Sequence, residues 1–144
     1  MVEILSSSNK LNKGDLELEK TKIFIIEDQM ILKLDLKNRL ESLNYEVVGM
    51  ADNGYDAIEQ IEKLVPDIVL MDIVLKGELN GIETAQLIKD KFNIPFIYMS
   101  AYYDDEILDK AAKTQPEGYI TKPYEDVMIR TTIEIAIKKR KYKT

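Results

Sequence analysis

Short apolar segments alternate along this chain with longer segments in which apolar residues recur at helical spacing. Five short segments, about two dozen residues apart, have the length and composition of buried strands: Ile23–Ile26, Val47–Ala51, Ile68–Met71, Phe96–Met99 and Tyr119–Ile120. Each gap between them contains a helical pattern. Because strand and helix alternate five times, the sequence predicts an α/β fold in which a parallel sheet is covered by helices on both faces.

The segments between the strands predict amphipathic helices. The first helix carries leucines at spacings of three and four residues, at Leu32, Leu36, Leu40 and Leu43. The next two helices begin after Asn53-Gly54 and Asn80-Gly81, and each ends before a proline. A shorter helix should follow Tyr103, with three apolar residues facing the core: Ile107, Leu108 and Ala111.

The last segment fits two patterns. Its isoleucines alternate as in a strand at positions 133, 135 and 137, whereas Val127, Ile129, Ile133 and Ala136 fit one face of a helix. A sixth parallel strand needs a crossover connection for which the chain has no room. We therefore predict a helix that has more apolar surface than one buried face requires.

The chain of 144 residues has the length of one domain with short ends. Residues 1–20 show no sustained periodicity and are predicted to be a flexible tail, followed by a domain at 21–140 and a basic end at 141–144. The chain has no cysteine and no histidine, so thiolate and imidazole metal sites are excluded. A bound metal must therefore be a hard cation with oxygen ligands, such as Mg²⁺ or Mn²⁺.

The charge distribution and the short apolar segments limit the class of partner. The net charge is −6, and five of the 20 basic residues lie in the last seven positions, so the rest of the chain is more acidic still and nucleic-acid binding by this domain alone is not expected. The apolar segments are far shorter than the ~20 residues of a membrane-spanning helix, and residues 1–20 lack the apolar stretch of a signal peptide. We expect a cytoplasmic protein without membrane contact.

Polar residues follow four of the five predicted strands directly. They are Glu27-Asp28 after the first strand, Asp72 after the third, Ser100 after the fourth, and Thr121-Lys122-Pro123 after the fifth. In a flavodoxin-like, doubly wound sheet of order 2-1-3-4-5 these four strands are contiguous, and ligands bind at their carboxyl ends. The second strand ends in Asp52-Asn53-Gly54, which is typical of a turn and a helix cap. The pattern therefore predicts one polar crevice at one edge of the sheet.

Three carboxylates in one crevice repel one another unless a cation lies among them. Lys122 adds one positive charge, and a divalent metal would complete the neutralisation. The crevice then accepts an anion, and a phosphoryl group can be held by the metal, Lys122 and Ser100 while a carboxylate attacks phosphorus.

Over Lys22–Lys139 the sequence resembles the receiver domains of bacterial and archaeal response regulators. Five segments carry the resemblance: Ile25-Ile26-Glu27-Asp28, Leu70-Met71-Asp72-Ile73, Gly81-Ile82-Glu83, Met99-Ser100-Ala101 and Gly118-Tyr119-Ile120-Thr121-Lys122-Pro123. The resemblance implies that Asp72 is the phosphoacceptor and that Mg²⁺ or Mn²⁺ binds Asp28, Asp72, the backbone carbonyl of Val74 and, largely through water, Glu27. It also implies that Lys122 pairs with the phosphoryl oxygens, that Ser100 moves to bond them, and that Tyr119 swings inward. The Lys122–Pro123 bond is often cis in this family.

By the same resemblance the protein is a signalling switch rather than an enzyme, although it would assist its own phosphotransfer and autodephosphorylation with the metal. A histidine kinase or histidine phosphotransfer domain would supply the phosphoryl group. The switch would act on the face of the last two helices, and the surplus isoleucines of the final helix suggest self-pairing as a homodimer. The alternative is a receiver-fold interaction module within a larger hybrid regulator.

The chain departs from the common family pattern at three points. Glu27 stands where aspartate is commoner, Val74 is apolar where polar side chains often influence the access of water, and the loop 72–81 is longer by about one residue and lacks a proline. The lifetime of the phosphorylated state therefore does not follow from the resemblance.

Each site residue also has a plainer interpretation when it is taken alone. Asp72 is a candidate loop cap, Glu27-Asp28 the acidic first turn of a helix, and Ser100 a helix N-cap. Tyr119 and Lys122 would be a core aromatic residue and a surface lysine. Two other functions are disfavoured: a flavin or nucleotide site needs a Gly/Ser/Thr-rich loop where Glu27-Asp28 stand, and a phosphohydrolase needs a second acid or base near Asp72.

Overall fold

The computed structural model describes residues 20–101 and 104–142. Within them five strands and five helices alternate: β1 (Lys22–Ile26), α2 (Met30–Ser42), β2 (Glu46–Ala51), α3 (Gly54–Leu64), β3 (Ile68–Met71), α4 (Gly81–Phe92), β4 (Phe96–Ser100), α5 (Asp105–Lys113), β5 (Gly118–Thr121) and α6 (Asp126–Lys141). All five predicted strands and the helical interpretation of the last segment are confirmed. The predicted flexible tail falls almost wholly outside the described residues, and the domain limits stay a prediction.

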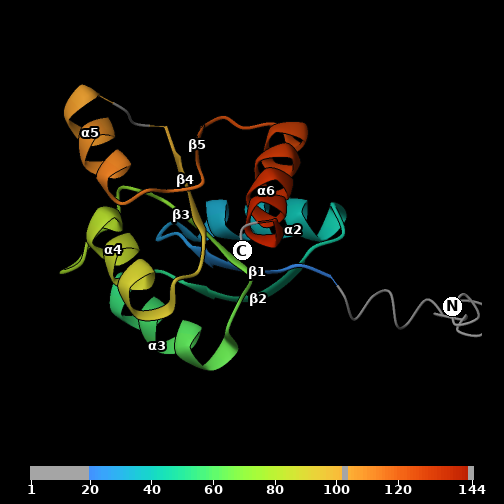
Figure 1. Cartoon of the computed structure of the whole chain (residues 1–144), viewed down its shortest axis with the longest axis horizontal. Coiled ribbons are helices and arrows are strands. Elements are labelled where there is room, and N and C mark those ends of the chain that lie inside the picture. The colour runs from blue at the N-terminus through green and yellow to red at the C-terminus, as the bar shows by residue number, and fades with distance from the viewer. Residues whose placement is uncertain (1–19, 102–103, 143–144) are drawn as a thin grey trace, which may run out of the picture.

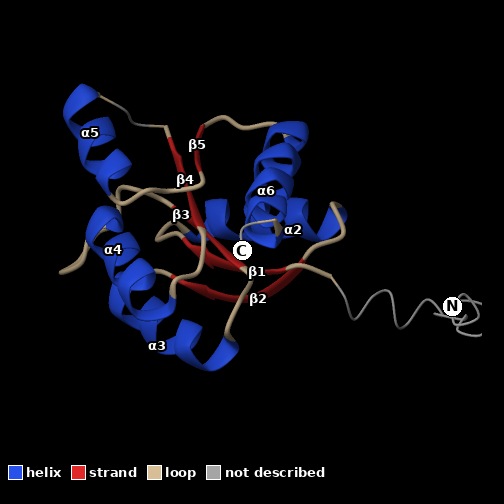
Figure 2. Ribbon diagram, viewed as in Figure 1, coloured by secondary structure: helices blue, strands red, loops and turns tan. Residues whose placement is uncertain are grey.

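The five strands form one parallel sheet of order β2-β1-β3-β4-β5, as predicted. Helices α2 and α6 cover one face, and α3, α4 and α5 cover the other (Figure 1). The helix and strand layers are distinguished by colour in Figure 2. Alternate residues of β4 serve the two faces: Phe96 and Tyr98 join the core under α3, α4 and α5, while Ile97 and Met99 join the core under α2 and α6.

Side-chain caps fix where three helices begin. The Asn53 side chain accepts a hydrogen bond from Asp56 N at 2.9 Å, and Asn80 forms a reciprocal capping box with Glu83. Helix α5 begins after Asp104, whose side chain accepts from Ile107 N at 2.8 Å. The prediction of Ser100 as a helix cap is therefore wrong, because this residue ends β4 four positions earlier.

Helix α5 packs less deeply than its sequence pattern predicts. Ala111 is buried and Ile107 packs partly against the core, but the Leu108 side chain is 37% exposed. The prediction that Leu108 faces the core is therefore wrong. Helix α5 has nine residues and one buried position, so its buried face is too narrow to include Leu108.

Helix α6 confirms the prediction of surplus apolar surface. It buries Ile129, Ile133 and Ala136 against the sheet. A second set of apolar residues, here called the α6 stripe, is exposed: Val127, Met128, Ile135 and Tyr142. Across the described residues no helix is both long and apolar enough to cross a bilayer.

Candidate functional site

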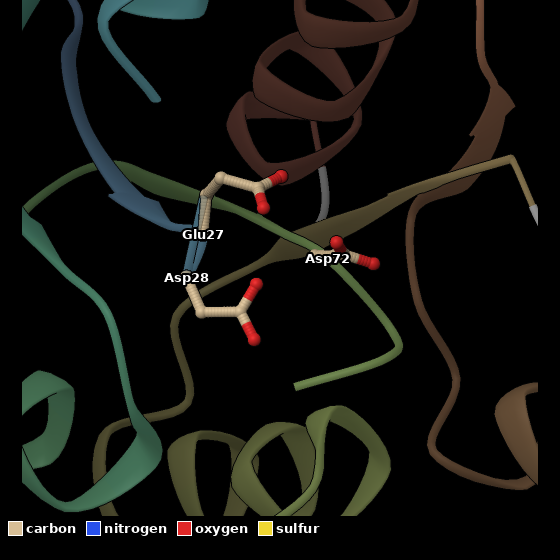
Figure 3. Close-up of side chains that lie close together, drawn as sticks. All are labelled: Glu27, Asp28 and Asp72. Atoms are coloured by element: carbon tan, nitrogen blue, oxygen red, sulfur yellow. The ribbon is translucent and has the colours of Figure 1, made fainter. Parts of the chain in front are cut away.

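The four polar strand ends meet at one edge of the sheet. Glu27 and Asp28 directly follow β1, Asp72 follows β3, Ser100 ends β4, and Lys122 follows β5. Figure 3 shows the side chains of Glu27, Asp28 and Asp72 gathered in one region, and one oxygen of each lies within 4.8 Å of the others. The convergence predicted from the strand order is therefore present. Because the sheet is parallel, its carboxyl ends are the only edge at which all four segments can meet.

Lys122 is the cation of this site. Its Nζ donates to Glu27 Oε1 at 3.1 Å and lies 3.5 Å from Asp72 Oδ2. The lysine side chain is only 16% exposed, so it is not the surface residue that its type alone would suggest. One ammonium is thus shared between two buried carboxylates. The Lys122–Pro123 peptide bond is cis, as the resemblance implies.

Backbone amides hold each of the three carboxylates. Gln29 N donates to Glu27 Oε2 at 3.1 Å, and Val74 N donates to Asp72 Oδ1 at 3.0 Å. Lys76 N, from the long loop after β3, donates to Asp28 Oδ2 at 3.2 Å. These donors fix the carboxylate orientations before any ligand arrives. These donors could not be predicted from the sequence, because a backbone donor leaves no signature in residue type.

The charges of the site are unbalanced. Burial, followed by the nearby charge of Asp72, raises the pKa of the Glu27 carboxyl, and the hydrogen bond from Lys122 opposes this rise. Three carboxylates face one ammonium, so with all groups ionised the cluster carries an excess of two negative charges. Oxygen donors this close together fit a small hard cation such as Mg²⁺.

A cavity of about 440 Å³ opens over the carboxylates. Asp72 and Ser100 line it with Lys122, and Val74 on its rim is 49% exposed. Glu27 does not line the cavity, since it lies beneath with 5% exposure. Asp28 and Asp72 thus lie in the cavity wall, although Asp72 itself is only 7% exposed, and Glu27 lies behind them. Four further residues, which carry no signal in the sequence pattern, line the cavity: Gln29, Leu32, Lys76 and Ala101.

Ser100 and Tyr119 are linked beside the cavity. Ser100 is 2% exposed at the end of β4. Burial raises the pKa of the Tyr119 hydroxyl, and a hydrogen bond with Ser100 opposes that rise. The Tyr119 ring lies 6.1 Å from the Tyr98 ring, centroid to centroid. The two predicted switch residues are therefore in contact, while their movement stays a prediction.

One of the plainer interpretations of the site residues does not hold, and another holds only as part of the site. Glu27 and Asp28 are not the first turn of a helix, because α2 begins at Met30 after the N-cap Gln29. The loop-cap interpretation of Asp72 is confirmed by the hydrogen bond that it accepts from Val74 N, and the same residue also lies against Lys122. By contrast, the turn and cap predicted after β2 are present at Asn53.

Comparison with known proteins agrees with this geometry. Residues 23–134 match the response regulator receiver domain. The chain is 30% identical to the transcriptional regulatory protein YdfI of Bacillus subtilis over 118 residues, which are 81% of this chain and 55% of that protein. It is 33% identical to the chemotaxis protein CheY of Thermotoga maritima, covering 72% of this chain and 87% of that protein.

Solved structures give the same result. The signal receiver domain of a modulated diguanylate cyclase from Desulfovibrio desulfuricans is 37% identical, with a TM-score of 0.82 over 85% of this chain and 98% of that chain. The chain spans about half the length of the first curated relatives it matches, at 55% and 56%. The match over residues 23–134, together with the five-stranded sheet and its acidic carboxyl edge, places this chain in the response regulator receiver family.

Proposed function

We propose that this receiver domain accepts a phosphoryl group on Asp72 from a phosphohistidine of another protein, with the help of a divalent metal. The observation that carries the proposal is the cluster of three carboxylates within 4.8 Å that shares Lys122. Asp72 lines the open cavity, whereas Glu27 lies beneath it. Asp72 is thus the carboxylate that combines access to a donor with a neighbouring cation.

The proposed reaction is a displacement at phosphorus. A carboxylate oxygen of Asp72 forms the new O–P bond while the P–N bond of the donor phosphohistidine breaks, and the departing imidazole keeps the electron pair and takes a proton. Val74 N–H holds Asp72 in one orientation for this attack. Lys122 and Ser100, which line the same cavity, would bind the phosphoryl oxygens and stabilise their charge.

The metal would be Mg²⁺ or Mn²⁺, held by Asp28, Asp72, the Val74 carbonyl and, largely through water, Glu27. When bound, it supplies positive charge against the phosphoryl oxygens. Phosphorylation turns the single charge of Asp72 into roughly two, so without a cation the excess negative charge of the cluster would rise further. Lys122 alone does not offset this, and we infer that phosphorylation depends on the metal.

The donor is proposed to be a histidine kinase or a histidine phosphotransfer domain, since the chain has no histidine of its own. Three apolar side chains of α2, here called the α2 patch, lie just after the acidic pair: Met30, Ile31 and Leu34, with exposures of 62%, 80% and 44%. Leu32 of the same helix lines the cavity. An apolar face of a donor protein would cover this patch while its phosphohistidine reaches Asp72. Both partners would act in the cytoplasm.

The α6 stripe supports self-pairing as a second contact. Its N-terminal end is acidic, with Glu125 and Asp126, and its last turn contains four basic residues. Antiparallel pairing of two α6 helices brings opposite charges together, whereas parallel pairing would bring the basic ends together. We therefore propose a weak antiparallel homodimer centred on Ile135.

Acetyl phosphate tests the chemistry without a protein donor. With Mg²⁺ it should add one phosphoryl group to the wild-type chain by intact mass, with no adduct on Asp72→Asn and little on Asp28→Asn. No adduct on the wild type, or an equal adduct on Asp72→Asn, contradicts the proposal. Adduct formation should also stop when EDTA replaces Mg²⁺.

The same substitution on two helices separates the two surfaces. Ile31→Lys should slow transfer from a phosphorylated kinase or phosphotransfer domain but leave the reaction with acetyl phosphate unchanged. Ile135→Lys should leave both reactions unchanged and abolish any concentration-dependent dimer in sedimentation. If Ile135→Lys slows protein-to-protein transfer as much as Ile31→Lys, the α2 patch is not the donor surface. If the wild type sediments as a monomer at millimolar concentration, self-pairing is wrong.

A further inference from the structure

A buried hydrogen bond joins the middle of β4 to the end of α5. Tyr98 is fully buried, and its hydroxyl lies 2.6 Å from Thr114 Oγ1. Thr114 Oγ1 also donates to the Ala111 carbonyl at 2.6 Å. Because that bond uses the only hydroxyl proton of Thr114, the Tyr98 hydroxyl is the donor to Thr114. The Tyr98 hydroxyl is therefore fixed to the last turn of α5.

The ring of Tyr98 packs beside Tyr119, one of the two predicted switch residues. Tyr98 and Tyr119 are direct partners in the β4–β5 register, with ring centroids 6.1 Å apart. Tyr119 in turn has a hydrogen bond with Ser100. Contacts thus run without a gap from the cavity, through Ser100, Tyr119 and Tyr98, to Thr114 at the C-terminal end of α5.

Helix α5 is weakly anchored elsewhere. Only Ala111 among its nine residues is fully buried, whereas each of the other helices buries at least three. The hydroxyl pair of Tyr98 and Thr114 is thus a large part of what holds this helix to the sheet. A helix with so few buried contacts shifts more readily than its neighbours.

We infer that Tyr98 is a positioning residue that couples Ser100 and Tyr119 to the placement of α5 through Thr114. The inference rests on the proposed function, since it concerns what phosphorylation of Asp72 changes. When Ser100 moves toward the phosphoryl group, Tyr119 shifts against the Tyr98 ring. The close-packed core leaves that ring little room, and breaking its bond to Thr114 would leave a buried hydroxyl unpaired. The displacement therefore passes to Thr114 and α5.

Hydrogen exchange of the α5 amides, 105–113, tests this coupling. In the wild type, acetyl phosphate with Mg²⁺ should change their exchange rates. In Tyr98→Phe and in Thr114→Val, each of which removes the hydrogen bond, that change should fall at least fivefold, the lower end of typical coupling between sites. Thr114→Ser keeps the hydroxyl and should respond like the wild type. The change in α5 exchange in the double variant should be no smaller than in either single variant, because both substitutions remove the same hydrogen bond.

The control is Tyr45→Phe. It removes another buried tyrosine hydrogen bond, 2.7 Å long, to Glu134 on the opposite face of the sheet. It should lower stability to a similar extent and leave the α5 response intact. A wild-type response in Tyr98→Phe, loss of the response in Thr114→Ser, or loss in Tyr45→Phe would overturn the inference. Intact mass is measured on each sample: absence of the adduct on the wild type refutes the proposed function instead.

Discussion

Asp28→Asn should stabilise the metal-free protein. Asp28 lies within 4.8 Å of two other carboxylates, and among the described residues no lysine or arginine forms an ion pair with it. Asparagine has nearly the same shape, and its oxygen can still accept the hydrogen bond from Lys76 N. The substitution therefore removes a repelled charge without removing a contact.

The magnitude follows from these distances. At an effective dielectric constant of about 20, each of the two repulsions, taken across 4.8 Å, is about 3.5 kcal/mol before solvent screening. Asp28 borders an open cavity, so solvent screening reduces the combined gain to about 1–2 kcal/mol. Asp72→Asn relieves the same kind of repulsion but loses the attraction to Lys122 at 3.5 Å. Its gain should be less than half as large.

Urea unfolding followed by circular dichroism measures both effects. In EDTA the Asp28→Asn midpoint should rise with an unchanged slope. In Mg²⁺ at ten times its dissociation constant, the wild type should gain about 1.4 kcal/mol while Asp28→Asn gains almost nothing, so the difference should close. Asp52→Asn is the matched control: an exposed acid after β2, outside the cluster, whose change should stay within about 0.5 kcal/mol. A lower midpoint for Asp28→Asn in EDTA, or an equal rise for Asp52→Asn, would refute the electrostatic reasoning.

Three further predictions concern the rest of the fold. Hydrogen bonds, first that from Tyr45, lower the pKa of Glu134 below its ordinary 4.5. The stability that they confer is therefore present above pH 4.5 and is lost as the pH falls through the lowered value. In urea unfolding between about pH 3 and 7, the free energy of unfolding of Glu134→Gln should fall less steeply toward acid pH than that of the wild type. Ile133→Ala should reduce the free energy of unfolding by about 2–5 kcal/mol, because this α6 side chain is fully buried against the sheet, whereas Ile135→Ala, at 54% exposure, should cost less than about 1 kcal/mol. Val65→Gly should raise the free energy of unfolding by about 1 kcal/mol, and with it the melting temperature, since Val65 is exposed and a β-branched residue is strained at φ 48°.

The sheet and the position of the site could be predicted from the sequence because both depend on local patterns. A run such as Ile68–Met71 is buried on both sides, and residue types alone reveal it. The parallel order then fixes which strand ends meet, so Asp28, Asp72 and Lys122 had to converge. Helix packing was less predictable: Leu108 has the spacing of a core residue, but how far α5 sinks onto the sheet depends on tertiary contacts.

The contacts that the sequence did not reveal have a common physical origin. The amide of Lys76 and the hydroxyl of Thr114 lie at loop and helix ends, where the partner is chosen by the path of the backbone and not by residue period. A tyrosine at position 98 in a buried strand reads as one more apolar residue, although its hydroxyl must find a partner once it is buried. In this chain that partner is Thr114, directly after α5, so the requirement to satisfy one buried hydroxyl also ties the helix to the strand that ends at Ser100. A polar group inside a segment that is expected to be buried therefore indicates where a site can be linked to a distant helix.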